Sequence, residues 1–322
     1  MPARLRQYGT LIAVAAIIVF FWISLPGTFM TGRNWLNISQ QVSMLAVTAF
    51  AMTIVMVMGD FDLSVGSMAS LAGIVAALAF RDAGSVPLGI IAALGVGFLG
   101  GLINGFLVSY IGILPFVATL GTLTVYSGLA FLLSGGKTIF GQEIPAAFSE
   151  FARGGIPLLE SGGQMLLLPN LTLAALLAFA LVWVFLEQTI YGRQLYAIGG
   201  NSEASRLAGV RVQPLRLAAF GLAGLGAAAA GLMYASRVAS ANPTQGSGLM
   251  LDAIAAVFLG MTMSREGEAH VAHTLVGVLI LGVLGNGLTQ LNVDSYVREM
   301  LIGSIIILAV ASSSLSKLRS SR

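Results

Sequence analysis

The sequence contains no cysteine, only two histidines and few charged residues. Asp, Glu, Lys and Arg make up 9% of its 322 residues, whereas a soluble domain carries roughly 25% because water must solvate its surface. The lack of cysteine excludes a disulfide framework and a thiolate metal site. The scarcity of charge excludes a sizeable soluble catalytic domain, and the net charge of +3 comes without a basic cluster that would favour nucleic acid.

Apolar residues dominate what is present: 57% of the chain is hydrophobic and its mean hydropathy is +0.92. A membrane-spanning helix needs roughly 20 apolar residues, and about ten runs approach that length. They predict an all-α integral membrane protein with one transmembrane domain over residues 1–322, whose candidate halves are 42–134 and 215–315. The runs cover 9–29, 42–59, 63–80, 87–110, 114–134, 166–187, 215–236, 249–263, 270–291 and 298–315.

The Lys and Arg residues predict which side of the membrane each loop faces, because cytoplasmic loops carry the excess of positive charge. With ten spans and the N-terminus inside, ten of these residues lie on the cytoplasmic side and six on the outer side. We therefore expect both termini in the cytoplasm. The longest outer segment, about 135–165, is predicted to be an irregular loop with a short surface helix near 145–152.

Two segments indicate an internal repeat. Residues 95–105 and 277–287 are identical at seven of eleven aligned positions, and the five spans between them make the two copies run in opposite directions. Inverted-topology repeats are characteristic of transporters, although two Gly- and Leu-rich helices also match by chance. In the first copy Gly97, Gly101 and Gly105 share one helix face, where they predict close approach of another backbone.

Polar side chains near the span ends are the candidates for a translocation pathway. Asp62 precedes Ser64 and a new helix, so it is a candidate helix cap or, alternatively, part of a proton relay. Asn104 and Asn286 occupy matching positions in the repeat, where an amide bonds across a helix crossing or lines a pathway. Hydroxyl and amide groups suit an uncharged polyhydroxy solute better than an ion. The residues assigned to the pathway or to helix packing are Asp62, Ser64, Ser67, Asn104, Thr119, Thr122, Asn286 and Gln290.

The two histidines, His270 and His273, lie three residues apart at the expected start of a span. A metal site would need a third ligand held in geometry, and none is evident, so we interpret them as solvated ends of that span. The sequence also lacks a nucleotide-binding loop. We therefore expect no metal or other cofactor on this chain, and the energy for transport must come from elsewhere.

The cytoplasmic segment 188–214 predicts a short helix. Asn201 is a suitable N-cap, Glu203 suits the positive first turn, and Gly209 is a suitable stop. A helix of two turns is unstable alone in water, so it must dock either on its own bundle or on a partner protein. The residues of this candidate docking element are Asn201, Glu203, Ala204, Arg206, Leu207 and Gly209.

Several blocks then carry a resemblance to a known family. The longest, at 192–210, reads Gly-Arg-Gln-Leu-Tyr-Ala-Ile-Gly-Gly-Asn-Ser-Glu-Ala-Ser-Arg-Leu-Ala-Gly-Val, and residues 59–66 read Gly-Asp-Phe-Asp-Leu-Ser-Val-Gly. The chain resembles the permease subunits of ABC importers for ribose, arabinose and related sugars over essentially its whole length. Further similar blocks lie at 101–105, 114–123 and 251–257.

The resemblance implies a permease of the bacterial inner membrane that passes a monosaccharide or related polyol into the cytoplasm. It implies three kinds of partner: a cytoplasmic ATPase that carries ATP and Mg²⁺ and contacts the 201–209 helix, a second permease (a copy or a sister chain), and an extracytoplasmic sugar-binding protein. The link at 260–274 departs from the family because it has lost most of its glycines. We expect this link to be stiffer, with altered coupling or a matching change in the partner.

Two other classes of protein compete with this interpretation. An ion-coupled secondary transporter of a small polar solute would need buried carboxylates. The only candidates in the sequence are Asp62 and Asp252, and both lie at span ends. A membrane enzyme would need a clustered acid, base or metal set, which the sequence does not offer. The sugar itself is normally selected by the binding protein.

Overall fold

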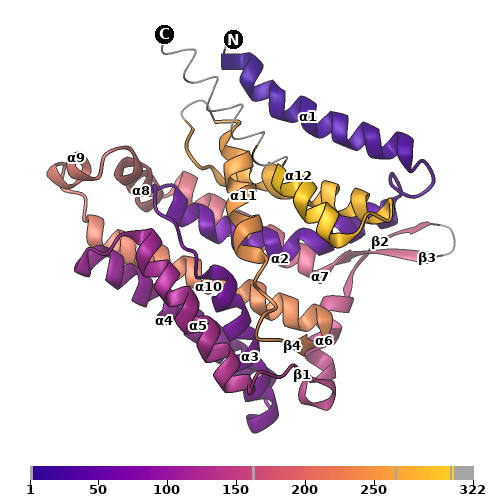
Figure 1. Ribbon diagram of the computed structural model, residues 1–322, viewed down its shortest axis with the longest axis horizontal. Coiled ribbons are helices and arrows are strands. Elements are labelled where there is room, and N and C mark those ends of the chain that lie inside the picture. Colours follow the sequence, from indigo (N-terminus) through magenta and orange to yellow (C-terminus); the bar gives the residue numbers. More distant parts are fainter. Residues whose placement is uncertain (1–2, 162–163, 265–266, 305–306, 308–322) are drawn as a thin grey trace.

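The computed structural model describes residues 3–161, 164–264, 267–304 and 307. Helices dominate it (Figure 1). They are α1 (Ala3–Ser24), α2 (Gly32–Met56), α3 (Val65–Ala83), α4 (Val86–Phe106), α5 (Pro115–Ser134), α6 (Ala146–Arg153), α7 (Asn170–Trp183), α8 (Ile190–Gly200), α9 (Ser202–Leu207), α10 (Val212–Val238), α11 (Leu249–Met261) and α12 (Val271–Gln290). The strands are β1 (Ile139–Phe140), β2 (Gly155–Ser161), β3 (Gln164–Pro169) and β4 (Ser240–Ala241).

Seven helical segments in the described part of the chain are long and apolar enough to cross a membrane. They comprise α2, α3, α5, α10, α12, and the helices α4 and α7 with the π-helical turns Leu107–Ile111 and Val184–Gln188 that continue them. The chain is therefore an all-α membrane protein, as predicted. The apolar parts of α1 and α11 are shorter, and much of the run predicted at 298–315 lies outside the described residues, so the total of ten spans stays a prediction.

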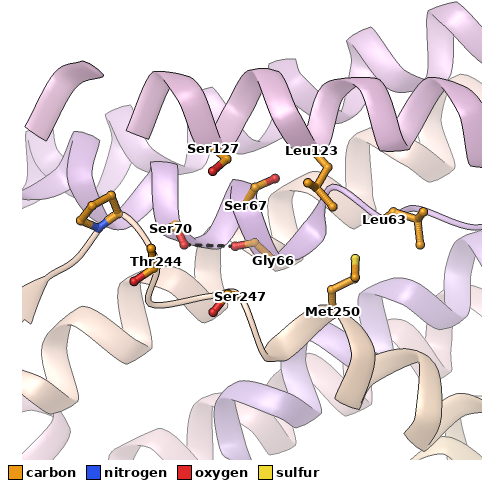
Figure 2. A pocket seen from close by; sticks show the side chains of 10 residues that line it. Leu63, Gly66, Ser67, Ser70, Leu123, Ser127, Thr244, Ser247 and Met250 are labelled. Atoms are coloured by element: carbon orange, nitrogen blue, oxygen red, sulfur yellow. Dashed lines mark hydrogen bonds between the residues drawn. The ribbon is translucent and has the colours of Figure 1, made fainter. Parts of the chain in front are cut away.

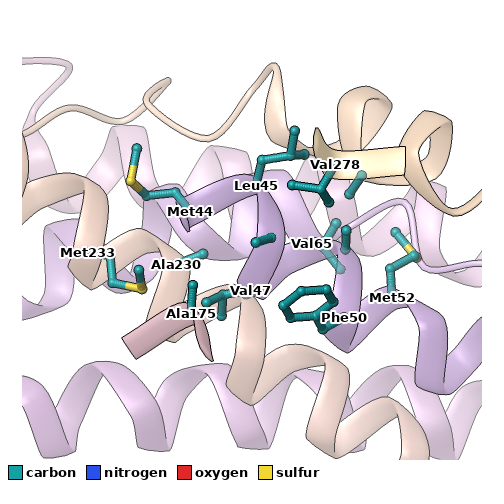
Figure 3. Packing of buried hydrophobic residues seen from close by; sticks show 14 of the residues in the cluster. Met44, Leu45, Val47, Phe50, Met52, Val65, Ala175, Ala230, Met233 and Val278 are labelled. Atoms are coloured by element: carbon teal, nitrogen blue, oxygen red, sulfur yellow. The ribbon is translucent and has the colours of Figure 1, made fainter. Parts of the chain in front are cut away.

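Helix α2 forms the centre of the bundle, with α7, α10, α11 and α12 packed around it. Buried residues make up 78% of its most apolar stretch, against 22% in the α7 segment. Figure 3 shows Phe50 and Val47 of α2 inside this core. The hydroxyls of α2 tolerate burial because they bond within the helix: Thr48 donates to the Met44 carbonyl at 2.9 Å. Such back-bonding satisfies the hydroxyl without a partner helix.

Close packing of α4 against α10 relies on the predicted glycine face. A Cβ atom at Gly97 would meet the Gly224 backbone, one at Gly101 the Phe220 carbonyl, and one at Gly105 the Leu217 backbone. Small residues allow such approach, and van der Waals packing and interhelical hydrogen bonds then hold helices together in lipid, where the hydrophobic effect does not. The prediction of a close backbone approach along this face is confirmed.

The second segment of the expected repeat packs differently. Gly277 lies against the Ala256 backbone of α11, whereas the corresponding glycine of the first segment, Gly95, has no neighbour within 4 Å of where its Cβ would lie. The inverted repeat itself stays a prediction.

The segment between α5 and α7 is more regular than predicted. The short surface helix is confirmed as α6, but β2 and β3 then form an antiparallel hairpin whose register joins Ile156 to Leu168 and Gly155 to Pro169. The expectation of an irregular loop to residue 165 followed by a span from 166 was wrong, because strand pairing satisfies the backbone until α7 begins at Asn170.

The run predicted at 249–263 is helical over Leu249–Met261, but this helix is shorter than the other spans. Helix α11 has 13 residues, about 20 Å at 1.5 Å per residue. Before it, residues 242–248 form a non-helical link that follows β4. Strand β4 pairs with β1, joining Ile139 to Ala241, and the link then runs beside α3, where Gly246 donates from its amide to the Ser70 hydroxyl at 2.9 Å.

The α4–α10 packing yields the first prediction. Gly101→Ala would press a methyl group into the Phe220 carbonyl, and overpacking of this kind costs about 1–3 kcal/mol of unfolding free energy. Gly95→Ala, in the same helix, is the matched control because no atom lies within 4 Å of its added Cβ. Thermal unfolding of the purified protein in detergent should show a lower Tm for Gly101→Ala alone. Equal Tm values for the two variants would contradict the proposed packing.

Candidate translocation pathway and coupling segment

Four of the sequence-predicted polar residues form one buried hydrogen-bonded chain across three helices. The Thr122 hydroxyl of α5 donates to Asn104 Oδ1 at 2.6 Å, and Asn104 Nδ2 donates to the Ser64 hydroxyl at 2.8 Å. Ser64 in turn donates to Asp62 Oδ1 at 2.6 Å. All four side chains are buried, so the network fixes α3, α4 and α5 relative to one another.

Asp62 also supports the start of α3. Its Oδ1 accepts the backbone amide of Ser64 at 2.9 Å, one residue before the helix begins at Val65. The carboxylate therefore accepts the amide of Ser64, which precedes the helix, rather than an amide of the first turn. Thr119 lies beside this network but donates mainly to the Pro115 carbonyl within its own helix, at 2.8 Å.

Asp60, two residues earlier, has a different partner. Its carboxylate forms a bidentate ion pair with Arg216 in the first turn of α10, at 2.5 Å to Nε and 2.8 Å to Nη2. Asp60 is buried, and a buried carboxylate of this kind requires a paired charge. The pair joins the α2–α3 link to α10.

Asn286 and Gln290 lie apart from this network. Gln290 Nε2 donates to Asn286 Oδ1 at 2.8 Å and to Asn34 Oδ1 at 3.0 Å. Asn34 belongs to the first turn of α2 and donates to the Phe29 carbonyl at 2.9 Å. These amides join the end of α12 to the start of α2, as packing contacts do.

Ser67, the remaining predicted residue, lines a cavity of about 140 Å³ between α3, α5 and the non-helical link (Figure 2). Sequence reasoning missed Ser127, Thr244 and Ser247. The signal that indicates them is the break Asn242-Pro243 before a span too short to cross. The cavity is lined by Leu63, Gly66, Ser67, Ser70, Leu123, Ser127, Pro243, Thr244, Ser247 and Met250.

The predicted docking helix exists and projects its apolar side chain outward. Asn201 Oδ1 accepts the Ala204 amide at 2.9 Å, and Gly209 follows the helix with a φ of 87°, a left-handed conformation that favours glycine. Ser205 is buried, whereas Leu207 is 79% exposed. Helix α9 therefore touches its own bundle through Ser205 and leaves Leu207 uncovered.

Glu203 and Arg206 form a surface ion pair on α9. Arg206 Nη2 lies 2.7 Å from Glu203 Oε1, with both side chains more than 60% exposed. A pair this exposed adds little to stability. Its two charges border Leu207 on the surface of the helix.

The histidines are not the solvated span ends that the sequence predicted. Tyr196 of α8 donates to Glu187 Oε1 at 2.9 Å and lies 3.1 Å from His270 Nδ1. Burial, together with the hydrogen bond to Glu187, raises the pKa of Tyr196 above its ordinary value. His273 packs edge-on against His270, with ring centroids 5.3 Å apart. The expectation was wrong because His270, at the N-cap of α12, lies against Tyr196, so the cluster joins α8 to α12.

The fold and these sites define a polytopic helical membrane protein in which a cavity bordered by serine and threonine hydroxyls and by apolar side chains lies between α3, α5 and the non-helical link before α11. Residues 34–310 match the family described as the permease component of the branched-chain amino acid transport system. The chain belongs to this permease family, so it is a transport component rather than an enzyme. No solved structure matches the chain.

Curated relatives are similar over nearly the whole chain. The ribose import permease protein of Bacillus subtilis (strain 168) is 37% identical over 309 residues, covering 95% of this chain and 92% of the relative. The ribose import permease protein of Escherichia coli (strain K12) is 36% identical over 312 residues, with coverage of 96% and 94%. The xylose transport system permease protein of Escherichia coli (strain K12) is 30% identical over 368 residues, with coverage of 98% and 94%.

The buried network yields a second prediction. In Asp62→Asn the amide oxygen still accepts the Ser64 backbone amide, so the protein should insert normally and transport at a reduced level. Asp62→Leu removes the carboxylate acceptors and should lower the amount of folded protein, because the Ser64 amide and the Ser64 hydroxyl hydrogen then lose their acceptor in a buried site. Transport and membrane yield of both variants are compared with the parent. Complete loss of transport in a normally inserted Asp62→Asn protein would instead establish an essential charge.

Proposed function

We propose that this chain is the permease subunit of an ATP-driven importer that carries a monosaccharide across the bacterial inner membrane into the cytoplasm. The observation that carries the proposal is the uncovered Leu207 on α9, within a chain that belongs to a permease family. An exposed apolar side chain on an otherwise polar two-turn helix favours a partner that covers it. A separate ATPase that binds ATP and Mg²⁺ is that partner.

The position of α9 determines how the protein is oriented in the membrane under this proposal. If α9 meets a cytoplasmic ATPase, then the α2–α3 link and the start of α12 at Val271 lie on the cytoplasmic side with it, and the β2–β3 hairpin and α6 lie outside. Both termini are then cytoplasmic, in line with the excess of Lys and Arg. The outer elements are the surface available to an extracytoplasmic sugar-binding protein.

The class of solute follows from two independent arguments. The relatives named above are ribose and xylose permeases, and the cavity beside the broken span is lined by hydroxyls without an ionisable side chain. Hydroxyl groups donate and accept, which matches an uncharged polyhydroxy solute. A second permease, either a copy or a sister chain, would complete the pathway.

The competing proposal of an ion-coupled secondary transporter finds little support. Asp60 is neutralised by Arg216 at 2.5 Å, and Asp62 is held by Ser64 and Asn104. Asp252 is exposed on the first turn of α11. The described part of the chain does not join these carboxylates into the series of groups that a proton relay needs.

The function is tested by reconstitution. The chain is placed in lipid vesicles with its ATPase and binding protein, and ATP-dependent uptake of radiolabelled D-ribose and D-xylose is measured. We expect uptake of at least one pentose that requires ATP and persists after an ionophore abolishes ion gradients. Uptake that follows an ion gradient without ATP would support the secondary transporter.

A third prediction concerns Leu207. Leu207→Asp places an unpaired charge in the proposed desolvated contact. Leaving a buried charge without its partner costs about 3–5 kcal/mol in other proteins, so we expect a loss of several kcal/mol of binding free energy. The ATPase should no longer co-purify and transport should fail, while the permease itself stays folded because this position faces water without the partner. Gln213→Asp, an exposed site at the start of α10, adds the same charge at the same end of the molecule as a control. Unchanged co-purification in Leu207→Asp would remove α9 from the coupling role.

A further inference from the structure

The hydroxyl-lined cavity carries an inference that rests on the proposed monosaccharide import and goes one step further. We propose that the cavity between α3, α5 and the 242–248 link binds the sugar during its passage, with Ser127 and Ser247 as its hydrogen-bonding groups. Figure 2 shows the two residues on opposite sides of the space, Ser127 from α5 and Ser247 from the link, with Ser67 of α3 between them.

The volume of the cavity and the lack of charged residues in its lining indicate which kind of solute fits. The cavity has a volume of about 140 Å³, whereas a single water needs only about 10–15 Å³ by the same kind of measure. It therefore has room for a solute several times larger than a water molecule. Its lining contains neither an acidic nor a basic residue, so nothing compensates the charge of an ion or of an amino acid, and a neutral solute is favoured.

Only some of the hydroxyl groups that line the cavity form hydrogen bonds within the protein. Ser70 accepts from the Gly246 amide at 2.9 Å, and Thr244 donates to Asn242 Oδ1 at 2.7 Å, so both hydroxyls serve the protein. Ser127 and Ser247 form no side-chain hydrogen bond with any described residue. A hydroxyl without a partner in the protein must be satisfied from outside it, which indicates that these two face water or a polar solute.

The link itself supports the same conclusion. Non-helical backbone within a membrane is tolerated only where it is buried in protein or lines a polar cavity, and broken spans commonly form substrate sites in transporters. Gly246 is held against the Gly66 backbone, whereas Thr244 and Ser247 are exposed. Gly246 thus fixes the link to α3, whereas Thr244 and Ser247 are free to contact a solute.

The first test removes the two hydroxyls. In the reconstituted transporter with its ATPase and binding protein, Ser127→Ala and Ser247→Ala should each lower the maximal rate of D-ribose or D-xylose uptake about fivefold, the usual effect of one neutral hydrogen bond. ATP hydrolysis should change less than uptake, so fewer sugars are carried per ATP. Ser134→Ala is the matched control, since Ser134 ends the same helix outside the cavity and should leave uptake unchanged.

The second test uses the absence of cysteine in the chain. Ser127→Cys introduces a single thiol of nearly the same size, which a membrane-impermeant methanethiosulfonate reagent should modify. Modification should stop uptake, and excess pentose with binding protein should slow the modification. Ser43→Cys is the control, because Ser43 is fully buried in α2 and should stay unmodified. This readout does not depend on the alanine variants folding normally.

The outcomes separate the two proposals. If the parent protein carries neither pentose, the proposed function fails. If it carries a pentose but both alanine variants match its rate, or if the Ser127 thiol is inaccessible or unaffected by the sugar, the site is overturned and the function stands. Reduced uptake together with protection of the thiol supports both.

Discussion

A lipid bilayer offers no hydrogen-bond partners, and this constraint governs the rest of the structure. Every polar group at membrane depth must be satisfied by the chain itself or by a wet cavity. The hydroxyls of α2 bond back to their own helix, as Thr53 does to the Ala49 carbonyl at 2.7 Å. The Asp62 network and the Asp60–Arg216 pair satisfy the buried carboxylates. In the described part of the chain, Ser109 Oγ and His273 Nδ1 are buried without a hydrogen-bond partner. Ser127 and Ser247 instead border one cavity, where a polar solute can satisfy their hydroxyls.

The same constraint explains why the middles and the ends of the helices pack in different ways. Helices pack by close backbone approach, as α4 and α10 do at Gly101, and such contacts are stiff. Charged and aromatic groups concentrate instead where the helices end. The Asp60–Arg216 pair joins the α2–α3 link to α10, and the cluster of Glu187, Tyr196 and His270 joins the coupling segment to α12. A push on α9 from the ATPase would thus reach both halves of the bundle.

Much of this was open to prediction from local sequence. Long apolar runs identify the spans, because the thickness of the bilayer fixes helix length. The N-cap Asn201 and the stop Gly209 identify α9, because both act within one turn. The failures have a common cause in contacts between segments, which the pattern of one segment alone does not show. The β2–β3 hairpin depends on pairing between strands, and the environment of His270 depends on Tyr196, 74 residues away.

The sequence by itself determined the solvent of the protein, the class of fold, the short helix α9 and the polar residues available for a pathway. Composition and short-range periodicity encode these properties. Only the tertiary structure decided how the polar residues divide: Asn104 joins Asp62, Asn286 serves packing, and Ser67 meets Ser127 and Ser247 around a cavity. Such groupings arise where a broken span is held against α3 by a backbone contact between Gly66 and Gly246. Backbone contacts between distant segments leave no periodic trace in a sequence, so folding alone brings these hydroxyls together.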